Sequence, residues 1–161
     1  MIGTANTKTI GPAGGTFSAA GDSIRLEIPA GAVDQETVFS IQEVENTLQK
    51  TGLGRSFRLL PESVEFKKDI EIIFKYDPGM INGTSAEQLG LAYQDKDGFW
   101  HRPRNSAVDT VAKEIKVSTR HFSDWTSHTR LILINNGKSV LKANEETQLQ
   151  VITQFYSENN D

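Results

Sequence analysis

Short runs of alternating apolar and polar residues, separated by turn residues, recur along most of this chain. The clearest run lies at residues 23–28, where Ile24, Leu26 and Ile28 alternate with polar neighbours. In an extended backbone these three side chains point to one face, so the run predicts a half-buried β-strand. Further strands are predicted at residues 7–10, 37–44, 56–60, 64–66, 69–76, 89–93, 99–101, 108–111 and 114–119.

Turn residues separate these runs. Clusters rich in Gly, Pro and Asp stand at residues 11–15, 29–32, 77–79 and 95–98. The cluster at 95–98 predicts a hairpin, because its Asp-Gly pair readily adopts positive φ. One helical turn is predicted at residues 84–89. About ten short strands with almost no helix predict an all-β fold, an antiparallel β-sandwich with at most one short helix.

The composition limits which classes of binding partner are expected. The chain has 161 residues, a net charge of -4 and no cysteine, and no apolar run approaches the roughly 18 residues of a membrane span. An acidic balance disfavours nucleic acid, which selects basic surfaces. We therefore expect no nucleic-acid partner, no membrane span, no metal and no cofactor. The expected partner is another protein or flanking domains of the same polypeptide.

The chain changes character after Trp125. An apolar run at residues 130–134, a turn at 135–138 and an alternating run at 147–152 predict two more strands. Two strands without a partner sheet are marginal. Residues 126–161 are therefore expected to be an incomplete second β-module, similar to the start of an immunoglobulin-like module, or strands that pair onto the first domain. The first of these alternatives implies that the native polypeptide continues beyond residue 161, and the second does not require it.

The most reactive stretch is His121-Phe122-Ser123, directly after the last predicted strand of the first domain. A serine hydroxyl can attack the carbonyl of the preceding residue, and the resulting ester is then hydrolysed. The reaction needs a base, which His121 could supply, with His101 or His128 as alternatives. A structural interpretation competes with this one: Phe122 would end a core strand and Ser123 would open a turn.

Several segments in this order resemble the ZU-five domain, a family named for zonula occludens and netrin-receptor proteins. The similarity covers residues 8–125 and lies in residues 10–17, 28–33, 57–62 with Phe66, 93–100 and 121–123. Lys67-Lys68-Asp69 departs from the family, many members of which have a proline there. The resemblance implies an interaction or structural module of a larger secreted or cell-surface protein. Some family members cleave their own backbone between the Phe and Ser of a His-Phe-Ser motif.

This resemblance makes cleavage between Phe122 and Ser123 the sharpest functional hypothesis, with at most one turnover and no external substrate. The alternative function is a carbohydrate-binding module that uses exposed aromatic side chains and does not process itself. Its candidate aromatics are Tyr93, Phe99, Trp100 and Trp125. Two weaker interpretations are a calcium-loop fragment at Asp95, Asp97 and Gly98, and a hydrolase triad of Ser123, His101 and Asp124.

Overall fold

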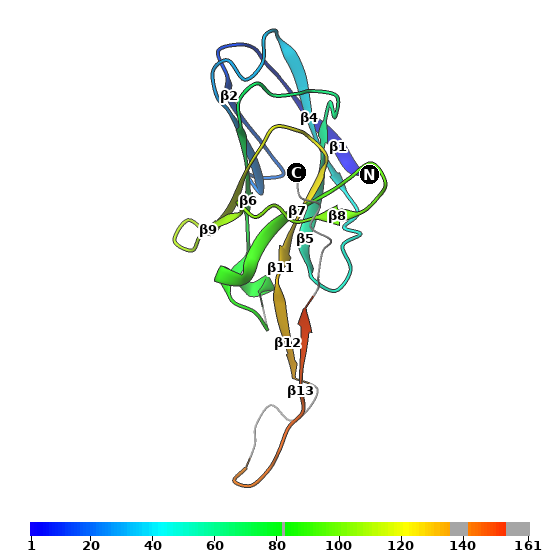
Figure 1. Ribbon diagram of the computed structural model, residues 1–161, viewed down its shortest axis with the longest axis vertical. Helices are drawn as coiled ribbons and strands as arrows, with labels where there is room; N and C mark the ends of the chain where they lie inside the picture. The colour runs from blue at the N-terminus through cyan, green and yellow to red at the C-terminus, as the bar shows by residue number, and fades with distance from the viewer. Residues whose placement is uncertain (82, 136–141, 154–161) are drawn as a thin grey trace.

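Two antiparallel β-sheets pack face to face and form a β-sandwich (Figure 1), which confirms the predicted fold class. The computed structural model describes residues 1–81, 83–135 and 142–153. The six-stranded sheet has the order β1-β4-β5-β11-β7-β8, and the five-stranded sheet has the order β2-β3-β6-β10-β9. Two further strands, β12 and β13, form a separate hairpin. No helix in these described ranges has the length and apolar character needed to cross a membrane.

The bounds of the strands follow the turn clusters closely. The six-stranded sheet comprises β1 (Ile2–Ile10), β4 (Thr37–Val44), β5 (Gly52–Leu60), β11 (Asp124–Thr129), β7 (Leu89–Gln94) and β8 (Trp100–His101). The five-stranded sheet comprises β2 (Gly15–Ala19), β3 (Ile24–Ile28), β6 (Ile70–Lys75), β10 (Glu114–Thr119) and β9 (Ala107–Asp109). The hairpin comprises β12 (Leu131–Asn135) and β13 (Leu149–Thr153), and the two 3-10 turns are η1 (Pro78–Met80) and η2 (Ala86–Gln88).

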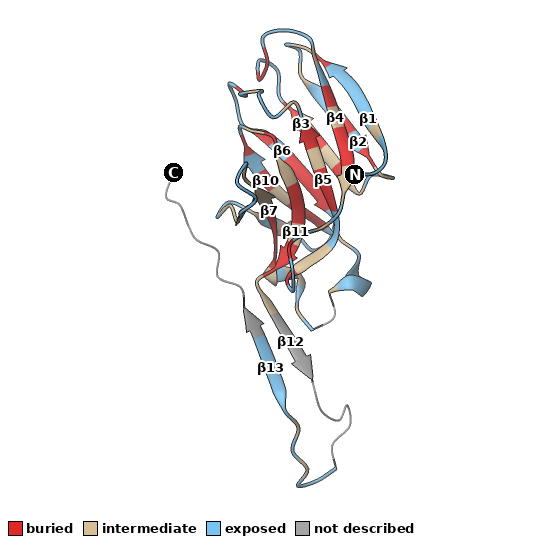
Figure 2. Ribbon diagram, turned by 90° about the vertical axis from the view of Figure 1, so that its right-hand side faces the viewer, coloured by how far each residue is buried: buried red, intermediate tan, exposed pale blue. Residues whose placement is uncertain are grey.

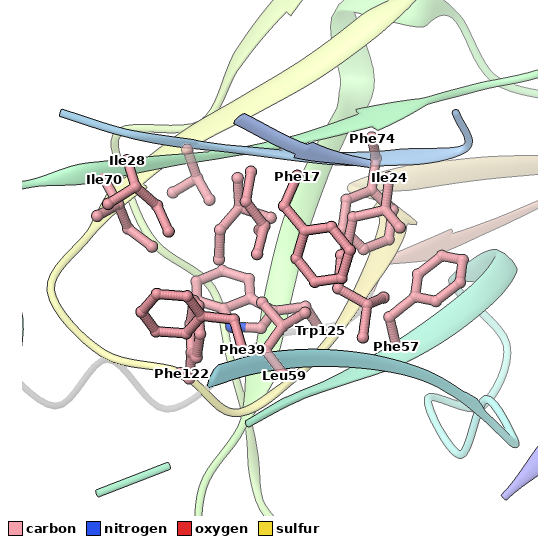
Figure 3. Close-up of a cluster of buried hydrophobic side chains, with 14 of the residues drawn as sticks. Phe17, Ile24, Ile28, Phe39, Phe57, Leu59, Ile70, Phe74, Phe122 and Trp125 are labelled. Atoms are coloured by element: carbon pink, nitrogen blue, oxygen red, sulfur yellow. The ribbon is translucent and has the colours of Figure 1, made fainter. Parts of the chain in front are cut away.

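The core lies between the two sheets. Figure 2 shows buried residues on strands of both sheets, and β3 shows the alternation most cleanly, since Ile24, Leu26 and Ile28 are all buried. In Figure 3, Phe39 and Trp125 lie opposite side chains of the five-stranded sheet. Trp125 is fully buried and is among the largest side chains of the core. Inward-facing apolar residues of both sheets therefore hold the sandwich together.

Four local predictions differ from the structure. Residues 114–119 were predicted to be the last strand of the first domain, but β11 follows them and pairs with β5 and β7. Residues 64–66 form no strand: the chain crosses there between the sheets, and Phe66 places its ring in the core. The first strand begins at Ile2 instead of residue 7, because β1 pairs with β4 along most of its length. The helical turn predicted at residues 84–89 is the 3-10 turn η2.

The hairpin β12–β13 extends away from the sandwich (Figure 1). β12 follows β11 after the single residue Arg130, and the strands of the sandwich run from Ile2 to Thr129. β13 lies where an alternating strand was predicted at residues 147–152. Of the turn predicted at residues 135–138, all but Asn135 lies outside the described residues.

Candidate functional site

Residues 120–123 form the crossover between the two sheets, from the end of β10 to the start of β11. Backbone hydrogen bonds hold both ends of this tetrapeptide. The Phe66 N–H donates to the Arg120 carbonyl at 3.1 Å, and the Leu59 N–H donates to the Ser123 carbonyl at 3.0 Å. The peptide bond between Phe122 and Ser123 therefore lies in a short segment with fixed ends.

The side chain of Phe122 anchors the crossover in the core. Its ring is 3% exposed and packs edge-to-face against Phe66 and Phe39, with centroids 5.0 and 5.5 Å apart. Edge-to-face packing suits the charge distribution of aromatic rings. Phe122 is therefore a core residue, as the structural interpretation expects, but it lies in the crossover and does not end a strand, and Ser123 leads into β11 and does not open a turn. The packing of the ring also restrains the carbonyl that Ser123 would attack.

His121 turns its imidazole toward an aromatic cluster. The ring lies 4.7 Å from Tyr93 in a T-shaped arrangement and 5.9 Å from Trp125, measured between centroids. Burial lowers the pKa of His121 below its usual value, because desolvation penalises the charged imidazolium. The imidazole is therefore neutral at physiological pH, the state in which it can accept a proton.

Thr119 fixes the orientation of this ring. Its Oγ1 lies 3.0 Å from His121 Nδ1 and accepts a hydrogen bond from the His121 backbone N–H at 3.4 Å. The Thr119 hydroxyl also lies 3.5 Å from the His121 carbonyl oxygen, to which it can donate. When Nδ1–H donates to Thr119, Nε2 carries the lone pair. Nε2 is buried and has no hydrogen-bond partner among the described residues.

Ser123 directs its hydroxyl to β7, where Oγ donates to the backbone carbonyl of Gln94. The next residue, Asp124, is held by Arg58 through two hydrogen bonds of 2.7 Å from Nε and Nη2. Both contacts fix the start of β11 between its neighbours β5 and β7. Asp124 is therefore engaged with Arg58, and it does not form the imagined triad with Ser123 and His101.

The two alternative bases, His101 and His128, lie on different strands of the six-stranded sheet. His101 stacks on Tyr93 with centroids 5.1 Å apart, and its Nε2 lies 2.6 Å from Asp95 Oδ2. Tyr93 thus connects His101 with His121 in one aromatic cluster. His128 is fully buried on β11. Five residues along a strand separate His128 from Ser123, a distance of about 16 Å, beyond the reach of a hydrogen bond.

The remaining candidate groups have structural roles. The carboxylate of Asp95 accepts hydrogen bonds from the N–H groups of Asp97 and Phe99, both at 2.9 Å, which makes it the cap of the predicted hairpin turn. The hydrogen bond from His101 is the main cause that lowers the pKa of Asp95. Trp125 is buried in the core, so it cannot stack on a sugar. Within the described part of the chain, no three His, Asp or Glu side chains cluster as metal ligands.

The sequence pattern did not single out Thr119 and Gln94. Thr119 is two residues before His121, the spacing that places alternate side chains of a strand on one face. That spacing could have identified Thr119 as a neighbour of the His121 side chain. Gln94 lies 29 residues from Ser123, and its carbonyl is brought there only by the pairing of β7 with β11.

Comparison with known proteins adds no identification. No protein-family model matches the chain, and a search of curated proteins finds no match.

Proposed function

We propose that this chain is a structural and interaction module of a larger secreted or cell-surface protein, of the ZU-five type, and that it cleaves itself once between Phe122 and Ser123. The observation that carries the proposal is the buried Nε2 of a neutral His121, which has no partner among the described residues and lies in the same crossover as Ser123. Buried polar atoms nearly always have a hydrogen-bond partner, so an unsatisfied one needs an explanation, and a catalytic role is one such explanation.

The proposed reaction starts with the hydroxyl of Ser123. Its oxygen leaves the Gln94 carbonyl and attacks the carbonyl carbon of Phe122, while His121 Nε2 accepts the hydroxyl proton. The C–N bond then breaks, and the proton passes to the departing amine of Ser123. Water hydrolyses the resulting ester, which leaves a carboxylate on Phe122 and restores the Ser123 hydroxyl.

The fixed ends of the crossover support this step. Twisting a peptide bond costs about 1 kcal/mol at ~12° and rises quadratically, so a twist of ~24° stores about 4 kcal/mol. Relief of that strain in the transition state would accelerate attack by roughly a thousandfold. The Phe122 ring in the core and the hydrogen bonds at Arg120 and Ser123 are contacts that can maintain such a twist.

The two pieces would stay together after cleavage. β11 follows the scissile bond directly and pairs with β5 on one side and β7 on the other. Its Trp125 is fully buried in the core. The C-terminal piece would therefore remain part of the folded sandwich, joined by strand pairing and packing instead of a covalent bond.

The test is the intact mass of the purified protein under denaturing conditions, followed over time at pH 8, 7 and 6. We expect two fragments, one ending at Phe122 and one starting at Ser123, whose masses sum to the full chain plus one water. Ser123→Ala should abolish both fragments and His121→Gln should slow their appearance, while the matched control His128→Gln should leave the rate unchanged. Because the pKa of His121 is lowered, the rate should be level above pH 7 and decline only as His121 becomes protonated at acidic pH.

Two results would refute self-cleavage. One is a single full-length mass throughout the incubation. The other is the same pair of fragments from Ser123→Ala, which would identify a contaminating protease. Gel filtration of the cleaved protein under native conditions should give one species of unchanged size.

A further inference from the structure

One row of side chains crosses the outer face of the six-stranded sheet. Its members are direct cross-strand neighbours on five adjacent strands: Gln42, Arg58, Asp124, Gln94 and Trp100. Alternate residues of a strand point to opposite faces. Because Trp125 points into the core, its neighbour Asp124 and the rest of the row point outward.

A hollow of about 220 Å³ lies over this row. Arg58, Asp124, Gln94 and Trp100 line it, together with Glu45 and Thr47 from the segment after β4. Met1 and Val44 complete its wall.

Two hydrogen bonds hold the segment after β4 over the sheet. Asn46 Nδ2 donates to Thr126 Oγ1 at 3.0 Å, and the indole Nε1 of Trp100 donates to Thr47 Oγ1 at 3.3 Å. The second bond also fixes the plane of the Trp100 ring beside the hollow. The walls are therefore in place before a ligand arrives, and a rigid site loses less entropy on binding.

The groups that face the hollow combine one aromatic ring with several polar atoms. Gln94 uses its amide nitrogen to bond the Gly98 carbonyl, which leaves its Oε1 as an acceptor. Arg58 engages Asp124 through Nε and Nη2, so the two charges compensate each other. Glu45 adds a carboxylate to the lining of the hollow beside this compensated pair, and a carboxylate repels phosphate, sulfate and carboxylate ligands.

We propose that this hollow binds a neutral saccharide, with one pyranose ring stacked on Trp100 and its hydroxyl groups bonded to Gln94, Asp124 and Glu45. A pyranose has an apolar C–H face and an edge of hydroxyl groups that both donate and accept. The hollow is smaller than the 300–1,000 Å³ typical of sites for drug-sized ligands, which suits a single ring. The proposal is independent of self-cleavage.

The test uses saturation-transfer NMR on the Ser123→Ala protein, which is covalently intact in either case. The probes are glucose, galactose, mannose, N-acetylglucosamine and their disaccharides, with glucuronic acid as the anionic comparator. We expect transfer to at least one neutral sugar, with weaker transfer to glucuronic acid. Titration of the bound sugar, followed in the amide spectrum, gives its Kd.

Two variants and one control decide whether the hollow is the site. Trp100→Ala removes the stacking ring and Gln94→Ala removes an acceptor, and each should raise Kd by roughly tenfold or more, which corresponds to about 1.4 kcal/mol. The control Phe99→Ala removes an aromatic that is 67% exposed but does not line the hollow, and it should leave Kd unchanged. The amide spectra of all three must show a folded protein.

The proposal is overturned if no neutral sugar gives transfer at millimolar concentration. It is also overturned if glucuronic acid binds as tightly as the neutral sugars, if Trp100→Ala and Gln94→Ala bind normally, or if Phe99→Ala loses binding.

Discussion

Acidification should destabilise the sandwich through His128. This side chain is fully buried on β11, and it packs against the backbone of Gly90 so closely that a Cβ added there would lie 3.0 Å from its Nε2. Burial lowers the pKa of His128 more than its hydrogen bond with the backbone of Thr129 raises it. The folded protein therefore takes up a proton at this site less readily than the unfolded chain does.

The direction and size of the change in unfolding free energy follow from this difference in proton binding. An unfolded imidazole titrates near pH 6.5, so below that pH the unfolded chain binds the proton and gains stability relative to the fold. The contribution of neutral His128 to the unfolding free energy is thus fully present well above pH 6.5 and is lost as the pH falls. The loss stops once His128 is also protonated in the folded protein. If the folded site stays neutral at pH 5.5, the loss there is about 1.4 kcal/mol, which is an upper bound.

The assay is urea unfolding at pH 7.5 and 5.5, followed by the fluorescence of the two tryptophans, Trp100 and the buried Trp125. It compares Ser123→Ala with the double variant Ser123→Ala, His128→Gln. The quantity of interest is the change in unfolding free energy between the two pH values. Groups other than His128 contribute equally to both proteins and cancel. The parent should lose up to about 1.4 kcal/mol more than the His128→Gln variant. Equal losses in the two proteins would refute the reasoning.

Two further predictions concern stability at neutral pH, measured by the same unfolding assay. Gly14→Ala and Gly21→Ala both place a side chain at positive φ (+73° and +65°), but only at Gly14 would the new Cβ meet backbone, at 2.4 Å from the Ile28 carbonyl oxygen. Gly14→Ala should therefore cost a further ~1–3 kcal/mol, and equal costs would show that the turn relaxes. Phe122→Ala should lower the unfolding free energy by about 3–5 kcal/mol, because it empties a core position. Phe99→Ala should lower it by less than about 0.5 kcal/mol, because Phe99 is exposed. A small loss in Phe122→Ala would mean that the ring does not anchor the crossover.

Periodicity predicted the fold where each strand has one buried face. Ile24, Leu26 and Ile28 alternate with polar residues, and β3 lies there with these three side chains in the core. Asp-Gly at residues 97–98 likewise predicted the hairpin between β7 and β8, where Gly98 has φ of +85°. Local sequence is sufficient in such cases because burial and turn geometry act on neighbouring residues.

The prediction failed where distant contacts decide the structure. The first residues of β1 show no apolar alternation, and they are held in part by Gln42, whose Nε2 donates to the carbonyls of Ile2 and Gly3 at 2.8 and 3.0 Å. Residues 64–66 have strand-like composition, yet the chain needs them to cross between the sheets. No local pattern distinguishes Phe66 in a crossover from the same residue in a strand.

The candidate site likewise has features that the sequence predicts and features that it does not. His121 and Ser123 were identifiable from their side-chain chemistry and spacing. The Gln94 carbonyl that accepts the Ser123 hydroxyl, and the row that ends at Trp100, depend on the register of strands far apart in the sequence. Both features follow only from the assembled sheet.

The direct passage of β11 into β12 has a mechanical consequence. Only Arg130 separates the two strands, so a force applied to the hairpin along its length reaches β11 without an intervening flexible segment. β11 is paired on both edges, and a pull along its axis loads these hydrogen bonds together in shear instead of opening them one at a time. Tension on the hairpin would therefore meet its main resistance at β11 and the buried Trp125.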